Sequence, residues 1–185
     1  VAGSVHAGLD LPYRDLDHRA MCQHAAGMLL GLGHRRVALM TAKSQRAGDL
    51  QSEAGFIEGV QKSSHPGTEV SVCRHDGSTE GIAKSLRRLM EQASPPTALL
   101  VVNPFHYLTV SSRLVQLGLQ IPRDMSLMSR DDDSFLLFVL PEPARYVTDS
   151  HLFAKGLLHP VLELLQGQVL SERGARIIPR FIRGG

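Results

Sequence analysis

One stretch of sequence, LLGLGHRRVALM at residues 29–40, decides the fold. Its first half completes an apolar stripe whose spacing of i, i+4, i+7, i+8 and i+11 fits one face of a helix: Met21, Ala25, Met28, Leu29 and Leu32. Gly33 can end that helix in the left-handed conformation. Val37–Met40 is then an uninterrupted apolar run, typical of a strand buried on both faces. A helix leading directly into a buried strand predicts an α/β fold.

The same alternation continues outward along the chain. Short apolar runs predict strands at Arg36–Thr41, Glu69–Cys73, Ala98–Val102, Ser126–Ser129 and, near the end, Arg176–Pro179. Helical periodicity predicts helices over Asp49–Gln61, from Ser78 or Thr79 to before Pro95, from Asn103 toward Gly118, and over Ser150–Gln166 with a kink at Pro160. This rhythm predicts a three-layer α/β/α lobe with a mainly parallel sheet.

Composition and charge exclude several classes of protein. The chain has 185 residues, 43% of them hydrophobic and 21% charged, which are ordinary globular proportions. Twenty Lys and Arg against eighteen Asp and Glu leave a charge of +2, too balanced for a strong DNA-binding surface. The longest apolar run, Phe135–Leu140, is too short to span a membrane. Cys22 and Cys73 form no CxxC pair and no secretory signal is visible after Val1, so we expect a cytoplasmic location and no membrane association.

Polar residues follow two of the predicted strands. Asn103 comes directly after Ala98–Val102, and Asp131–Asp133 comes shortly after Ser126–Ser129. Ligands of open α/β sheets bind at the carboxyl ends of the strands. Asn103 is therefore either a helix N-cap or a ligand contact, or both, and Asp131 is either a turn cap or a ligand contact.

Catalytic, metal and cofactor sites find little support. Asp131–Asp133 is the only candidate magnesium or phospho-acceptor cluster, and it lacks a second acidic cluster or a partner lysine. His18 and Cys22 lie one helical turn apart, but a buried cysteine with solvated His18 and His24 is the commoner arrangement. The sequence contains no nucleophile elbow and no glycine-rich phosphate loop. We therefore predict no enzyme, no metal and no cofactor.

Several blocks of sequence together carry a family resemblance. They are Asp17–Ala20, Leu29–Ala38, Gly55–Phe56, Pro95–Ala98 with Asn103, Leu117–Leu127, Asp131–Asp132, Pro141–Pro143 and Arg183. In order and spacing they resemble the effector-binding region of the lactose-repressor family of bacterial transcription regulators, which is itself similar to periplasmic sugar-binding proteins.

The resemblance implies a protein of two lobes that close over a small effector. On this reading residues 1–16 are the end of the first lobe and residues 17–141 are the second lobe. Residues 142–170 return to the first lobe, and residues 171–185 supply a C-terminal strand of the second. The family also implies a homodimer and an N-terminal helix-turn-helix headpiece, lying before Val1, through which alone operator DNA is bound.

The resemblance further implies ligand-binding positions, two of which depart from the family pattern. Asn103 and Asp131 match positions that contact polar effectors. Ser52 stands where the family has an effector-clamping arginine, and Gly77 stands where an aromatic residue is frequent. Arg46 or Arg130 could supply the missing guanidinium, or either could be a solvated surface residue.

Function follows from the resemblance. The sequence predicts the effector-sensing and dimerisation region of a LacI-type regulator, with a small, sugar-like effector. Two alternatives stay open: a periplasmic-type solute-binding protein, and a dimerisation module that has lost ligand binding because of Ser52 and Gly77.

Overall fold

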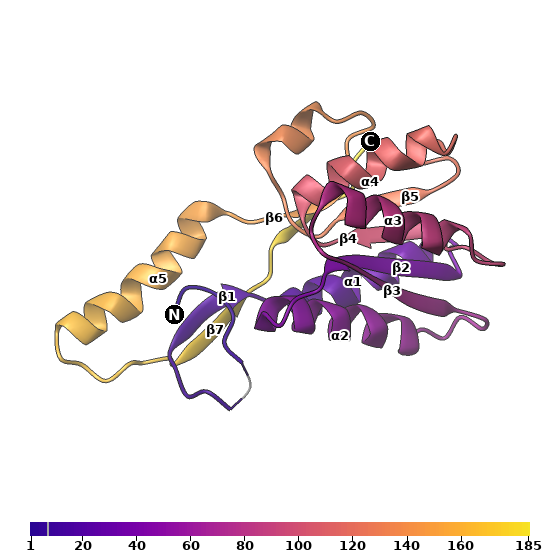
Figure 1. Cartoon of the computed structure of the whole chain (residues 1–185). Helices are drawn as coiled ribbons and strands as arrows, with labels where there is room; N and C mark the ends of the chain where they lie inside the picture. The colour runs from indigo at the N-terminus through magenta and orange to yellow at the C-terminus, as the bar shows by residue number, and fades with distance from the viewer. Residues whose placement is uncertain (7) are drawn as a thin grey trace.

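The computed structural model describes residues 1–6 and 8–185, and contains a large and a small β-sheet (Figure 1). The large sheet has six strands in the order β3-β2-β4-β5-β6-β8, and the small sheet pairs β1 with β7. All pairs are parallel except β6 with β8. The strands are β1 Tyr13–Leu16, β2 Arg36–Ala42, β3 Glu69–His75, β4 Ala98–Val101, β5 Ser126–Ser129, β6 Ala144–Val147, β7 Gly174–Ile177 and β8 Arg180–Ile182.

Helices cover both faces of the large sheet. The helices are α1 His18–Gly31, α2 Ala47–Gln61, α3 Thr79–Met90, α4 Pro104–Gln116 and α5 Ser150–Leu165, with a 3-10 turn, η1, at Ser134–Phe138. Val37 and Leu39 of β2 belong to the core under α1 and α2, while Ala38 and Met40 belong to the core under α3 and α4. The predicted three-layer α/β/α fold with a mainly parallel sheet is confirmed.

Local signals place most element ends correctly. Gly33 has a φ of 98°, the left-handed conformation expected after α1. The side chain of Ser78 accepts from the Gly81 N–H and caps α3, and Asn103 caps α4. Leu32, expected on the buried stripe of α1, is instead 67% exposed, because the helix ends one residue earlier.

The C-terminal part differs from the predicted elements. The single strand expected at Arg176–Pro179 is two strands, β7 and β8, separated by Ile178 and Pro179. Proline has no N–H to donate to a ladder, so the strand is interrupted at this point. The sequence analysis also missed β6 and η1. Helix α5 runs from Ser150 to Leu165 with Pro160 inside it.

The chain passes between the two sheets at three short links. These are Asp17 between β1 and α1, residues 148–149 between β6 and α5, and residues 178–179 between β7 and β8. Helix α5 lies beside the small sheet (Figure 1). Strand β6 lies in the large sheet, whereas the proposed return to the first lobe begins at residue 142. The division into lobes stays a proposal, and we place the lobe boundaries at these three links.

None of the helices in the described residues has the length and apolar character needed to cross a lipid bilayer.

Candidate functional site

Two cavities lie beside the N-terminus of α2, near the carboxyl ends of the strands. The inter-sheet cavity, of about 400 Å³, is lined by Gly3, Ser4, His6, Asp15, His18, Arg46, Ala47, Gly48, Asp49 and Arg130. The strand-end cavity, of about 530 Å³, is lined by Thr41, Ala42, Lys43, Ser44, Gln45, Asp49, Leu50, Glu53 and Arg74. Asp49, in the first turn of α2, borders both.

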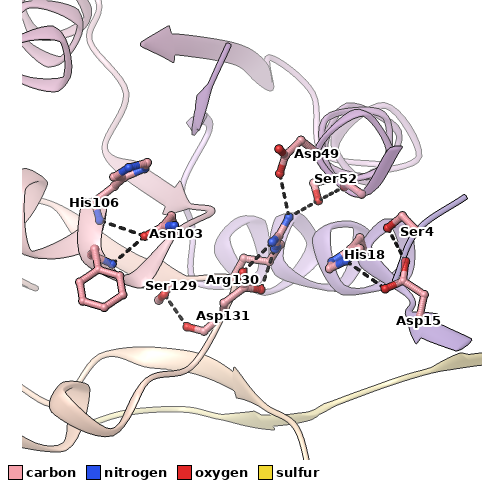
Figure 2. Close-up of polar contacts among 12 residues, drawn as sticks. Ser4, Asp15, His18, Asp49, Ser52, Asn103, His106, Ser129, Arg130 and Asp131 are labelled. Carbon is pink, nitrogen blue, oxygen red and sulfur yellow. Dashed lines mark hydrogen bonds and ion pairs between the residues drawn. The ribbon is translucent and has the colours of Figure 1, made fainter. Parts of the chain in front are cut away.

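Arg130 is the centre of the polar contacts between these cavities (Figure 2). It follows β5 directly, and its backbone N–H donates to the Val101 carbonyl at 2.8 Å, which fixes its position at the sheet edge. Its Nε donates to Asp131 Oδ1 at 2.8 Å, and a terminal nitrogen donates to Asp131 Oδ2 at 2.6 Å. Its other terminal nitrogen lies 2.7 Å from Ser52 Oγ and 3.6 Å from an Asp49 oxygen.

Burial and pairing act in opposite directions on this guanidinium. Only 7% of the Arg130 side chain is exposed. Burial opposes its charge, but the hydrogen bonds and negative charge of Asp131 raise the pKa of Arg130 above its ordinary value. A buried guanidinium whose Nε and two terminal nitrogens all have partners stays charged and is held in one orientation.

Ser52 is in direct contact with one of the two arginines named in the sequence analysis. The serine is fully buried, donates from Oγ to the Gly48 carbonyl at 2.7 Å, and accepts from Arg130. The guanidinium of Arg130 reaches position 52, and its substitution for the family's arginine stays a prediction. Arg46 is exposed at the N-cap of α2 and lines the inter-sheet cavity.

The Asp131 side chain pairs with Arg130, and Asp131 is not among the residues that line the two cavities. Both of its carboxylate oxygens accept from Arg130, and 31% of the side chain is exposed. The turn itself is held by Ser129, whose Oγ donates to the Asp131 backbone carbonyl at 2.6 Å. Contact between Asp131 and an effector stays a prediction.

Asn103 and Gly77 also lie at strand ends but do not line either cavity. Asn103 Oδ1 accepts from the backbone N–H groups of Phe105 at 2.8 Å and His106 at 3.4 Å, as an N-cap does. Gly77 has a φ of 90° in the turn after β3, and its N–H donates to His75 Nδ1 at 3.0 Å. Their contact with an effector stays a prediction.

A second polar group, not predicted from the sequence, lies in the inter-sheet cavity. Asp15, at the end of the small sheet, accepts a hydrogen bond from Ser4 Oγ and lies 3.6 Å from His18 Nε2 (Figure 2). Burial opposes ionisation of Asp15, but hydrogen bonds from His18 and Ser4 hold its pKa below the ordinary value. The prediction of a solvated His18 is wrong, because only 12% of its side chain is exposed. The predicted burial of Cys22 is confirmed.

The three consecutive carboxylates of Asp131–Asp133 do not converge. Asp131 pairs with Arg130, Asp132 pairs with Arg145 at 2.6 Å, and Asp133 caps η1 by accepting from the Phe135 N–H. Within residues 1–6 and 8–185, no three His, Cys, Asp or Glu side chains are arranged to hold a metal ion. The site is therefore built of hydrogen-bonding and ion-paired groups.

Known proteins similar to this chain belong to a family with this architecture. The family model for the periplasmic binding protein-like domain matches residues 26–185. The transcriptional repressor CytR of Escherichia coli (strain K12) is 21% identical over 170 residues, which cover 92% of this chain and 50% of the repressor. The chain thus spans half or less of the length of the first curated relatives it matches.

Solved structures of regulators share the fold. A putative transcriptional regulator LacI from Bacillus cereus subsp. cytotoxis superposes with a TM-score of 0.86 at 19% identity, covering 99% of this chain and 65% of that one. A LacI family transcriptional regulator from Enterococcus faecium, solved with bound ribose, has a TM-score of 0.79 at 18% identity, covering 98% of this chain and 66% of that one.

Proposed function

The chain belongs to the family of periplasmic binding protein-like domains, in the form carried by LacI-type transcriptional regulators, and from this premise we propose that it senses a small polar effector. The observation that carries the proposal is the buried Arg130 cluster between two cavities at the carboxyl edge of the large sheet. Its relatives are transcriptional regulators, and we propose no catalytic step.

The inter-sheet cavity gives the proposal a mechanism. Ser4 and Asp15 belong to the small-sheet side, while Gly48 and Asp49 belong to α2 on the large-sheet side. A ligand that contacts both sides stabilises one arrangement of the two sheets over others. In the full-length regulator this change in the arrangement of the sheets would alter a DNA-binding headpiece. We propose that this headpiece is the part that binds operator DNA. Carboxylates beside the cavity suit hydroxyl groups, so a sugar-like effector is favoured.

We also propose that the protein forms a homodimer and acts in the cytoplasm. Exposed apolar residues gather on α4, η1 and the loops that follow them, here called the α4–η1 face: Phe105, Leu108, Val115, Leu117, Leu137, Phe138 and Leu140. Large exposed apolar surface marks association sites in soluble proteins. A two-fold interface would bury the same face on both copies.

Titration calorimetry tests effector binding. The protein is titrated with D-ribose, D-glucose, D-galactose and cytidine, and at least one is expected to give a saturable heat of binding. Asp49→Asn should weaken that binding at least tenfold, because it removes a charged acceptor that borders both cavities. Asp124→Asn, which changes an exposed ion pair with Arg123 on the connector before β5, is the matched control.

Two results would count against the proposal. If Asp124→Asn and Asp49→Asn weaken the affinity for the ligand equally, the binding site lies elsewhere. Absence of binding by every compound in a wider panel of sugars and nucleosides, with the protein folded by circular dichroism, would favour a dimerisation module that has lost its ligand.

A further inference from the structure

We propose that this site takes neutral or positively charged, hydroxyl-rich ligands and discriminates against sugar acids and sugar phosphates, with Arg130 as the specificity-determining residue. The inference rests on the proposed function, because it names the ligand class of the same site. Three observations carry it: which groups the donors of Arg130 contact, which charged groups remain in the cavity walls, and which side chains those walls lack.

The donors of Arg130 are engaged by other groups of the protein. Its Nε and both terminal nitrogens are engaged by Asp131, Ser52 and Asp49, and 7% of its side chain is exposed. The carboxylates around it are more open, with 22% of the Asp49 side chain and 31% of the Asp131 side chain exposed. Arg130 lines the inter-sheet cavity, but each of its three nitrogens already has a protein acceptor or carboxylate neighbour (Figure 2), so it has little capacity left to bind an anion, whereas the carboxylates beside it are partly exposed.

The remaining charges of the cavity walls reinforce this. Arg74 is paired with Glu53, to which its Nε donates at 3.1 Å, so this guanidinium is also occupied. Asp15 and Asp49 line the inter-sheet cavity, and the pKa of Asp15 lies below its ordinary value. An anion entering there meets the carboxyl groups of Asp15 and Asp49, whereas a hydroxyl or ammonium group can donate to their oxygens.

Two wall cations have no carboxylate partner among the described ion pairs, and both are at the rim. Lys43 and Arg46 lie on the loop between β2 and α2 with exposed side chains, where water screens their charge. Because these side chains are exposed to water, they bind an anion less strongly than a buried guanidinium with free N–H groups would.

Aromatic stacking is also missing from the walls. Among the described residues lining the two cavities there is no Phe, Tyr or Trp. A nucleobase would find no flat apolar face there, so recognition depends on hydrogen bonds to carboxylate and amide oxygens. A compact polyol or amino sugar matches that set of acceptors.

Matched ligand series test the inference by calorimetry at low ionic strength. Each series keeps one sugar and changes its charge: glucosamine, glucose, glucuronate and glucose 6-phosphate; galactosamine, galactose and galacturonate; ribose and ribose 5-phosphate. In the series that binds, the neutral or amino member should bind at least tenfold more tightly than the acid or phosphate. Asp49→Asn should reduce this ratio about tenfold by removing one repelling carboxylate. Glu80→Gln, on the exposed first turn of α3, should leave the ratio unchanged.

The outcomes separate this inference from the proposed function. An acid or phosphate that binds as tightly as its neutral counterpart overturns the inference and leaves ligand sensing intact, above all if Arg46→Gln then abolishes anion binding. A charge preference that Asp49→Asn does not alter also overturns it. Failure of every member of every series to bind overturns ligand sensing itself.

Discussion

Arg130 and Asp131 depend on each other for their stability in the folded chain. The guanidinium is buried, and two of its hydrogen bonds end on one carboxylate. Removing one partner of such a pair leaves a buried charge with fewer contacts, which costs more than the pair itself contributes. Ser52 and Asp49 compensate only in part, because the Asp49 contact is 3.6 Å long.

Asp131→Ala should therefore lower the free energy of unfolding by about 2–4 kcal/mol. Asp124→Ala, which removes an exposed pair with Arg123 and the hydrogen bond that Asp124 Oδ2 accepts from the Gln120 N–H, should cost only about 1 kcal/mol. Urea denaturation of both variants measures the difference. If both variants lose the same small free energy of unfolding, the Arg130 guanidinium is stabilised by solvent or by other groups. Its hydrogen bonds to Asp131 then contribute little to stability.

His75 should make the fold sensitive to mild acid. It is 1% exposed, and burial, with a smaller contribution from nearby His106, lowers its pKa to about 4. Between about pH 6.5 and pH 4 the unfolded chain binds a proton at this residue that the folded chain does not. Stability is therefore lost as the pH falls through this window, by about 2 kcal/mol between pH 7 and pH 5 from this residue alone.

The measurement compares unfolding free energies at pH 7 and pH 5 in wild type and His75→Asn. Asparagine keeps an acceptor for the Gly77 N–H but does not titrate, so the loss between the two pH values should be about 2 kcal/mol smaller in the variant. His65→Asn, at an exposed loop position, should change the loss very little. An unchanged loss in His75→Asn would show that His75 does not resist protonation in the folded protein.

Much of the site lay beyond prediction from single residues. Asn103 could be identified because an N-cap is a local signal, and the structure confirms that role. Asp15, His18 and Asp49 carry no local signal, since only the folding of three separate elements brings them to one cavity. The burial of Arg130 depends likewise on the small size of Ser52, which is 78 residues away in sequence.

At the scale of elements, helix α2 depends on glycine to approach α1. A Cβ on Gly55 would lie 2.8 Å from Arg19 Cα and would also collide with the Arg19 carbonyl oxygen, and a Cβ on Gly59 would lie 2.8 Å from Ala26 Cβ. These glycines therefore set the separation of the two helices. Because α2 also carries Asp49 and Ser52, the same contact positions part of the Arg130 cluster.

Gly55→Ala should lower the free energy of unfolding by about 1–3 kcal/mol, because the helices must move apart. Gly27→Ala in α1, where an added Cβ meets nothing within 4 Å, should instead raise it by about 0.5–1 kcal/mol through helix propensity. Thermal and urea unfolding of the two variants give these opposite signs. Similar effects in both would indicate that the helix contact is looser than the structure has it.

The sequence predicts elements well where they are periodic and poorly where they are short and polar. Strand β4 is apolar throughout and β2 holds the apolar run Val37–Met40, and both buried runs were identified. Strand β6 reads ARYV and holds buried Arg145, which is paired with Asp132 and Glu142, so no alternation revealed it. The break between β7 and β8 follows from Pro179, but the change of sheet is a property of the tertiary fold.

At the scale of the whole molecule, the α4–η1 face should control self-association. Leu140 is 91% exposed and Phe138 is 85% exposed. Leu140→Glu should shift the protein from dimer to monomer at micromolar concentration, because a charge in a two-fold interface is desolvated on both copies. Light scattering after size exclusion measures the mass. Leu165→Glu, an exposed position on α5, serves as the control.

A wild-type protein that is monomeric at high micromolar concentration would exclude a stable homodimer of this chain. Loss of the dimer in Leu165→Glu but not in Leu140→Glu would move the interface to α5.

The three links between the sheets have a mechanical consequence. They must lie close together, because Leu16 is paired with Ile177 in the small sheet and Val147 with Arg180 in the large one (Figure 1). Three short links side by side act as a hinge: they allow bending about one axis and resist sliding and twisting of one sheet relative to the other. The small sheet and α5 would then rotate together as one rigid unit. A molecule bound in the inter-sheet cavity would limit this rotation and so set the angle between the two sheets.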